Sequence, residues 1–341
     1  MKLVIGAATA IAAIALSAAT PASDWSVPDL TWLGDDAEEQ FAESRRICAQ
    51  ATGSRPTPAD HPTPAERAAL KGCDSAALYY GIGIAADPVA ARKCAMIERE
   101  QSKGDDLRLL DGEGILMMVY ANGRGAERDF DIAIHMACQL SDAPAAMEGR
   151  ITRLAELRQS RWTGEDFESC DDITSGMSGG ICAGLGSRIA EQERSAWIAD
   201  LGAGWTPAQR ALFDRVYQSF SDYAETAHAL DCFRGTLQAA CAIIGREEEL
   251  ERFLDRVEAL IAGRQPTRAV PDERHANAAT GSSKWKAMVA EVEPSDRSWY
   301  RENGRETVAA RARFERELLA FAASVVPNRT RRQVRQFFSD L

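Results

Sequence analysis

The sequence contains a repetition with a spacing of 42 residues, which limits the possible folds more than any other feature. Four residues of one segment recur in the same order: Gly81, Gly83, Asp87 and Ala91 return as Gly123, Gly125, Asp129 and Ala133. Each copy reads as an apolar helix, a Gly-x-Gly loop, an aspartate and a second apolar helix. Repeats of this length are typical of helix pairs that bury their apolar faces on one another. The pattern therefore predicts a short helical solenoid.

The Gly-x-Gly element also suggests a phosphate-binding loop. Such a loop follows a β-strand and leads into Gly-Lys-Ser or Gly-Lys-Thr, and neither feature accompanies Gly81 or Gly123. Glycine ends a helix readily because it adopts the left-handed conformation without penalty. Asp87 and Asp129 stand where the cap of the following helix is expected. We therefore predict structural turns at Gly81, Gly83, Gly123 and Gly125, with no bound phosphate.

The eight cysteines indicate disulfides, because their number is even and the chain begins like an exported protein. They are Cys48, Cys73, Cys94, Cys138, Cys170, Cys182, Cys232 and Cys241. Their spacing does not match a zinc site, and the histidines are scattered at positions 61, 135, 228 and 275. The predicted pairs are local: Cys48–Cys73, Cys94–Cys138, Cys170–Cys182 and Cys232–Cys241. Cys94 and Cys138 are paired because both lie in second helices of neighbouring repeats.

The first residues predict export. Lys2 precedes an uncharged run, and small residues follow up to Ala22, which is typical of a secretory signal. Residues 1–22 are therefore predicted to be a signal peptide, and the mature protein to be periplasmic or secreted. No later apolar run approaches the roughly 18 residues that cross a bilayer.

The charge of the chain favours some partners over others. Removal of Lys2 with the signal takes the formal net charge from −11 to −12. An acidic chain is a poor ligand for nucleic acids and for anionic membranes. It is compatible with a cationic protein partner.

Helical patterns continue beyond the repeats, and no segment reads as a strand. Expected helices lie at residues 37–50, 64–72, 145–157, 189–201, 207–227, 246–262, 306–325 and after Pro327. Between them, FESCDDITSGMSGGICAGL is expected to form a Gly/Ser-rich loop closed by Cys170 and Cys182. Asp171 and Asp172 suggest calcium binding or catalysis, but the ligand spacing of a calcium loop is missing. A polar loop held by a disulfide is the favoured interpretation.

Catalytic motifs are missing from the sequence. No nucleophile elbow, zinc-protease motif or serine-lysine motif stands in a suitable context. A pair of carboxylates could still serve a glycosidase, and the composition, with 51 acidic residues, leaves this alternative open. We predict a protein without catalysis, cofactor or metal.

The repeated segments, LYYGIGIAADPVAA and VYANGRGAERDFDIA, resemble the Sel-like repeat, a relative of the tetratricopeptide repeat. The resemblance covers residues 73–140. The Tyr-x-x-Gly-x-Gly core is present at residues 120–125, whereas the first copy has Leu78 in place of the tyrosine. Such repeats imply contact with another protein and no reaction of their own.

A wider resemblance covers the mature chain. YYGIG, MMVYANGRG, APAAMEGR and CDDITSGMSGGIC, in this order, resemble the lysozyme inhibitor LprI family, in its exported members with an N-terminal Sel-like part. Asn277 fits an acid-x-x-Leu-Asn pattern of that family, with alanine for leucine. The family also has a Gln-x-x-Trp-x-x-Tyr-Arg-Asp motif. The residues at its five named positions are Val308, Arg311, Phe314, Glu315 and Arg316, and only the aromatic character of Phe314 is retained.

The resemblance implies an all-α, disulfide-linked binding protein that blocks lysozyme or a related cell-wall hydrolase. An adaptor that binds envelope proteins through its repeats is the alternative. The expected organisation is a signal peptide (1–22), a Sel-like domain (23–158), a helical middle region (159–263), a linker (264–283) and an LprI-like helical domain (284–341).

Overall fold

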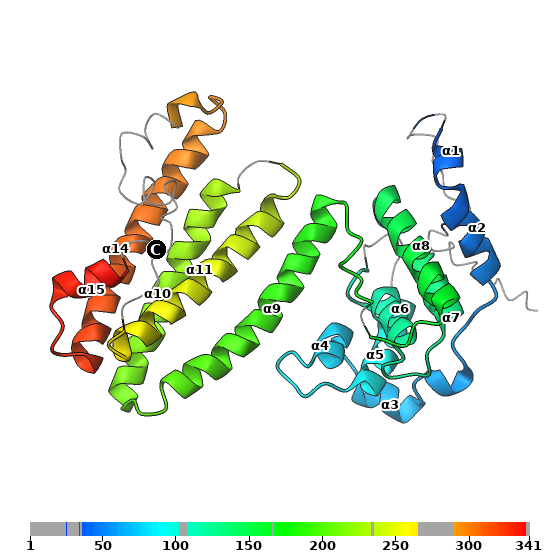
Figure 1. Cartoon of the computed structure of the whole chain (residues 1–341), viewed down its shortest axis with the longest axis horizontal. Helices are drawn as coiled ribbons and strands as arrows, with labels where there is room; N and C mark the ends of the chain where they lie inside the picture. Colours follow the sequence, from blue (N-terminus) through cyan, green and yellow to red (C-terminus); the bar gives the residue numbers. More distant parts are fainter. Residues whose placement is uncertain are drawn as a thin grey trace, which may run out of the picture.

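A computed structural model describes residues 25, 34, 36–101, 108–165, 167–232, 235–264 and 289–338. As predicted, the fold is all-helical, and these residues contain no β-strand. Figure 1 shows the helices in two groups. The first group comprises α1 (Ala37–Gln40), α2 (Ala42–Ala51), α3 (Pro64–Ala69), α4 (Ser75–Tyr80), α5 (Pro88–Gln101), α6 (Gly112–Asn122), α7 (Phe130–Ala137) and α8 (Pro144–Ser160). The second comprises α9 (Gly176–Leu201), α10 (Pro207–Asp231), α11 (Gln238–Ile261), α14 (Arg297–Val325) and α15 (Arg331–Phe337).

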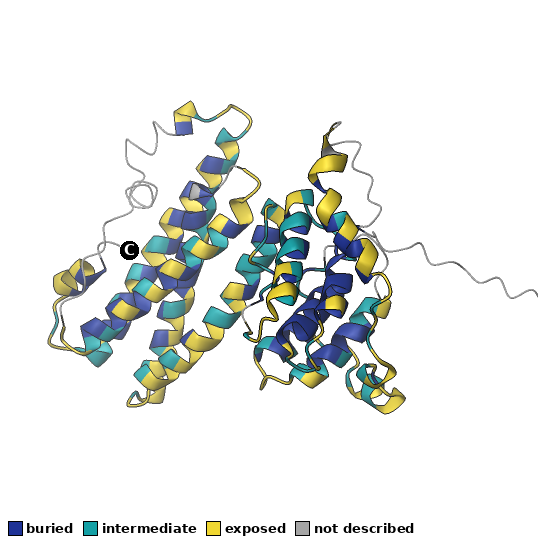
Figure 2. Ribbon diagram, turned by 45° about the vertical axis from the view of Figure 1, so that its right-hand side comes forward, coloured by how far each residue is buried: buried dark blue, intermediate teal, exposed yellow. Residues whose placement is uncertain are grey.

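The two repeats form stacked helix pairs, α4 with α5 and α6 with α7. An equivalent backbone hydrogen bond closes the loop of each pair. The amide of Asp87 donates to Leu78 O at 2.8 Å, and the amide of Asp129 donates to Tyr120 O at 3.0 Å. Helix α6 lies at the centre and is buried along its whole length. One hydrophobic core runs from Trp25 through both repeats to Phe167, and Figure 2 shows many residues of these helices coloured as buried.

The second group is a bundle whose core is rich in aromatic residues. An apolar stripe on α10 is buried there, with Phe213, Val216 and Phe220 at most 1% exposed. Phe220 lies 4.5 Å from Phe253 of α11 and 4.8 Å from Phe314 of α14, measured between ring centroids. Residues predicted to belong to a middle region and to a C-terminal domain thus share one core.

Helix α9 begins earlier than the sequence predicts. The expected loop of residues 167–185 is helical from Gly176 onward, because Ser175 caps the helix by accepting from the amide of Ser178 at 3.1 Å. Gly176 is needed for a close approach: a Cβ there would lie 1.7 Å from the carbonyl oxygen of Thr236. Glycines that we interpreted as turn residues therefore allow α9 to pack closely against the start of α11.

Two other helices are also longer than predicted. Helix α11 begins at Gln238, so its acidic residues lie in the middle and not in the first turn, and α14 begins at Arg297. Phe314, Leu318 and Phe321 of α14 are buried in the core, whereas Val308 of the same helix is 39% exposed. The predicted signal peptide lies outside the described residues, and of the predicted linker only Arg264 falls within them. Among the described helices, none combines the length and apolarity required to cross a bilayer.

Candidate functional site

All eight cysteines form disulfides, but two predicted pairs are wrong. Cys170–Cys182 and Cys232–Cys241 form as predicted, while the structure joins Cys48 to Cys138 and Cys73 to Cys94. By the 42-residue shift Cys94 corresponds to Met136, not to Cys138. A difference of two residues is about 200° around a helix, so Cys94 and Cys138 face different neighbours. Helix α2 packs on α7 and α8, which brings Cys48 to Cys138 with 5.8 Å between Cα atoms.

The repeat loops are the turns that the sequence predicts. Gly81 and Gly123 end α4 and α6 in the left-handed conformation, with φ of 78° and 65°. Asp129 accepts from the amides of Asp131 and Ile132, and Asp87 accepts from the amide of Ala90 at 2.9 Å. Their polar groups therefore serve helix ends.

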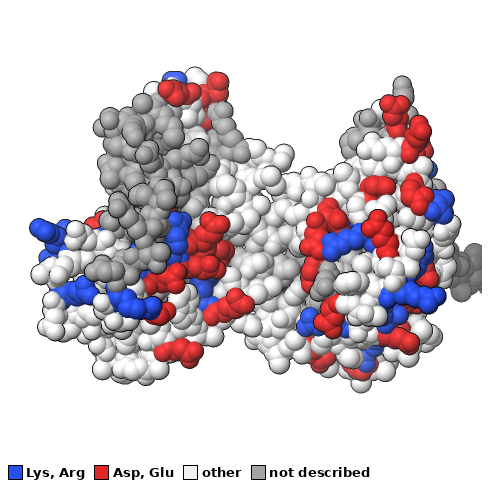
Figure 3. Space-filling model, in the orientation of Figure 1, with Lys and Arg blue, Asp and Glu red and all other residues white. Residues whose placement is uncertain are grey.

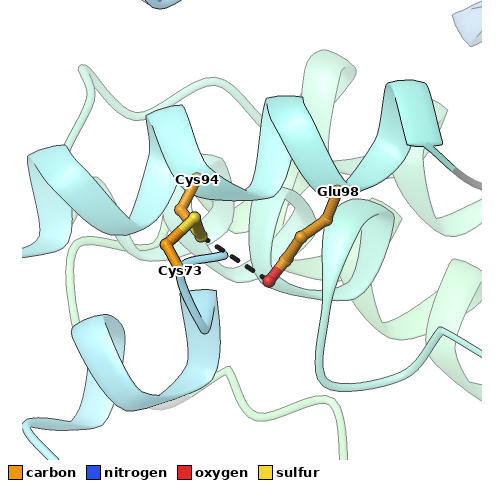
Figure 4. A group of neighbouring side chains, drawn as sticks. All are labelled: Cys73, Cys94 and Glu98. Carbon is orange, nitrogen blue, oxygen red and sulfur yellow. Dashed lines mark hydrogen bonds between the residues drawn. A yellow bond between two sulfur atoms is a disulfide. The ribbon is translucent and has the colours of Figure 1, made fainter. Parts of the chain in front are cut away.

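Cys73, Cys94 and Glu98 are close enough to suggest a metal site (Figure 4). Both sulfurs belong to the disulfide, so neither is a thiolate that could bind a metal. Glu98 lies 3.6 Å from Cys94 Sγ, which has no hydrogen to donate in this state. Its carboxylate instead accepts from the amides of Ser75 and Gly112, both at 3.0 Å. Glu98 thus stabilises the N-terminal ends of α4 and α6.

Three carboxylates, those of Glu168, Asp171 and Asp172, lie in the segment between α8 and α9. Tyr80 donates to Glu168 Oε2 at 2.6 Å, and Arg153 pairs with Asp171 at 2.6 Å. Burial raises the pKa of Glu168 and the pKa of Asp172 above their usual values. Perturbed carboxylates can mark a site, but these contacts also tie residues 168–172 to the repeats. The same contacts fit the predicted polar loop held by Cys170–Cys182.

Helices α9 and α11 lie side by side and run in the same direction. Gly176 approaches Thr236 near the start of both helices, and Ser187 donates to Glu247 Oε1 at 2.8 Å further along. Arg194 of α9, which is 3% exposed, also pairs with Glu247. These contacts fix the register of the pair.

The register places two series of residues next to each other. Positions seven apart lie on nearly the same face of a helix, because seven residues make about two turns. A Cβ at Gly179 would lie 3.2 Å from Leu237 Cδ2, so the two series begin in contact. The series on α9 is Gly179, Gly186, Glu193 and Asp200. The other series is Leu237, immediately before α11, followed by Ile244, Glu251 and Glu258 on α11.

This surface is uncharged along its first half and acidic along its second. No charged residue occurs at 173–187 or 235–245. We define the acidic face as Glu193, Asp200, Glu248, Glu251 and Asp255, which are all exposed. None of these carboxylates has an ion-pair partner among the described residues, whereas Glu258 pairs with Arg264 at 2.5 Å. Figure 3 shows acidic side chains gathered over α11 beside a largely uncharged surface.

Sequence reasoning missed the acidic face. Spacings of three and four residues between Glu248, Glu251 and Asp255 already indicate a shared face on a helix. The contribution of Glu193 and Asp200 depends on the parallel register of α9 and α11, which no local pattern reveals.

Comparisons of the chain with known protein families, with curated proteins and with solved structures found no match.

Proposed function

We propose that the protein is an exported, non-enzymatic inhibitor that binds lysozyme or a related cationic cell-wall hydrolase through the acidic face of α9 and α11. The acidic face carries this proposal. Its exposed carboxylates have no ion-pair partner in the described part of the chain, so they are available to a basic surface. Attraction between opposite charges accelerates encounter and selects the orientation in which two proteins dock.

Exposed apolar side chains on the same surface support the same function. Leu237 is 59% exposed and Ile244 is 51% exposed, both in the uncharged half of this surface, and Ile244 lies one helical turn before Glu248. Apolar contacts beside charged residues are typical of protein interfaces, in which a few buried side chains supply most of the affinity. A basic hydrolase could thus bury Leu237 and Ile244 while its cations meet Glu248 and Glu251.

Export and disulfides fit this role. Four disulfides in one chain favour an oxidising compartment, where cell-wall hydrolases act. The predicted signal peptide and the resemblance to the LprI family support the same location and activity.

A titration of the purified protein into lysozyme that is digesting cell walls tests the proposal. The proposal expects a dose-dependent loss of lysis that weakens as salt is added, because salt screens exposed charges. Unchanged lysis at a large excess of the protein would contradict inhibition. Lysis by the protein without added lysozyme would show that it is a wall-cleaving enzyme and not an inhibitor.

An envelope adaptor acting through the Sel-like repeats is the second candidate. One observation favours it: Ile84 in the first repeat loop and Val89 at the start of α5 are exposed, at 50% and 48%. Capture of a specific envelope protein that is lost on substitution of Ile84, without any effect on lysozyme, would favour the adaptor.

A further inference from the structure

The C-terminal end of the chain is basic, although the protein as a whole is acidic. Residues 297–338 contain ten arginines and four glutamates, a net charge of +6, so the rest of the chain carries −17 within the total of −11. A net charge of −11 would repel an anionic surface if it were spread evenly, but one end of this molecule has the opposite sign. Figure 3 shows basic side chains at the left edge of the molecule, over α15.

Helix α15 lies back along α14, which brings basic residues of the two helices together. Arg311 of α14 donates to Phe338 O at 3.3 Å, and Arg335 of α15 lies 3.7 Å from Glu315 of α14. Val334 of α15 is buried in the core, so the helix turns its other side outward. We define the basic surface as four arginines that are all exposed: Arg316, Arg331, Arg332 and Arg335.

Most of this positive charge is not neutralised within the described part of the chain. Arg316, Arg331 and Arg332 have no ion-pair partner there. Glu315, which adjoins the basic surface, is shared between Arg311 at 3.5 Å and Arg335 at 3.7 Å. Because two cations share this one carboxylate, a positive charge remains even beside Glu315. The basic surface is therefore available to an anionic partner.

We propose that the basic surface docks on the anionic phospholipids of a bilayer. Clusters of about four to eight basic residues on a helix bind such membranes, because each residue adds a weak attraction to the charged headgroups. Exposed arginines on the outside of two helices can contact several headgroups at once, since a bilayer is an extended surface. The export predicted from residues 1–22 would place the protein beside such a bilayer.

The acidic part of the molecule is compatible with this orientation. Figure 1 shows α15 at one end of the molecule, with α9 and the repeats on the other side of α10 and α11. At physiological salt, exposed charges more than about 8 Å apart are largely screened from one another. Carboxylates on α9 therefore contribute little repulsion when α15 faces the bilayer. The inference does not depend on lysozyme binding, because the acidic face lies on other helices.

Co-sedimentation of the mature protein with lipid vesicles tests the docking. We expect binding to vesicles of equal parts phosphatidylglycerol and phosphatidylcholine, no binding to phosphatidylcholine alone, and weaker binding as salt is added. The variant Arg316→Gln/Arg331→Gln/Arg332→Gln should bind at least tenfold more weakly. Its control, Arg46→Gln/Lys71→Gln/Arg161→Gln, removes three exposed cations from the first group of helices and should bind like the wild type.

Two results would overturn the proposal: no binding of the wild type to anionic vesicles, or equal weakening by the two triple variants. Inorganic phosphate distinguishes a membrane surface from a site for a small anion. Phosphate that releases the protein from vesicles no better than sodium chloride of equal ionic strength supports membrane docking. Release by phosphate where sodium chloride has no effect would contradict it.

Chemical modification of arginines gives a second test on the unaltered protein. Phenylglyoxal reacts with accessible guanidinium groups, and mass spectrometry locates each modified residue. On anionic vesicles, Arg331 and Arg332 should become protected, while the exposed Arg161 of the first helix group reacts as in solution. Equal protection of all three arginines, or protection of none, would contradict docking through the basic surface.

Discussion

Cys48 of α2 is bonded to Cys138 at the end of α7, across 90 residues of sequence. The bond closes the longest loop of the four disulfides and fixes α2 against the repeats. In the chain-entropy account a loop of this length stabilises the fold by about 4 to 5 kcal/mol, and the nine-residue separation of Cys232–Cys241 by about 2.5 kcal/mol.

Replacement of Cys48 and Cys138 by alanine should therefore lower the free energy of unfolding more than replacement of Cys232 and Cys241. Denaturant titration of both double variants measures the difference. Non-reducing peptide mapping of the wild type checks the connectivity, and a peptide joining Cys48 to Cys73 would contradict the structure.

Gly125 and Gly83 provide a matched pair for the stacking of the repeats. Both have positive φ, 96° and 73°, but a Cβ at Gly125 would collide with Pro88. Gly83→Ala should cost about 1 kcal/mol of unfolding free energy from the left-handed backbone alone, and Gly125→Ala clearly more. Thermal unfolding of both variants compares them, and equal losses would argue against the close contact between the repeats.

Arg150 and Asp142 form an ion pair that is almost completely buried, with side chains 0% and 1% exposed and 2.8 Å between Nη2 and Oδ2. Arg150→Met leaves the aspartate buried without its cation, so we expect a loss of about 3 to 5 kcal/mol in unfolding free energy. Adding Asp142→Asn should recover part of that loss. A double variant as unstable as Arg150→Met would indicate that the arginine acts through packing.

Glu168 makes stability depend on pH. Burial raises the pKa of Glu168 above its usual value of 4.5, so the folded state favours the protonated acid. The stability linked to this group is present below pH 4.5 and is lost as pH rises through the raised pKa. Glu168→Gln keeps an acceptor for Tyr80 without a charge to bury.

The glutamine variant should therefore be more stable than the wild type at pH 7, and the difference should vanish near pH 4. Denaturant unfolding at both pH values measures it, with the exposed Glu127→Gln as control. A variant that is less stable at both pH values would show that the Tyr80–Glu168 hydrogen bond requires the carboxylate.

The repeats and the helix ends could be predicted from the sequence because they depend on local chemistry. Gly81 ends α4 and Asp129 caps α7 as expected, and Thr63 and Thr206 each form a capping box with the residue three positions later. The pairing of Cys48 with Cys138 could not be predicted from the sequence, because it depends on which helices pack together. The start of α9 was missed because glycines that bring helices close resemble glycines that make turns. The acidic face, which spans two helices, needed the parallel register of α9 and α11.

Binding of lysozyme by charge-neutralised variants tests the central claim most directly. One variant removes three charges from the acidic face, Glu248→Gln, Glu251→Gln and Asp255→Asn. Its control removes three exposed charges elsewhere, Glu39→Gln, Glu127→Gln and Asp214→Asn. By titration calorimetry at low salt, we predict that the acidic-face variant binds lysozyme at least tenfold more weakly than the wild type, while the control binds like the wild type. Equal affinities for the two variants, or no binding by the wild type, would contradict the account.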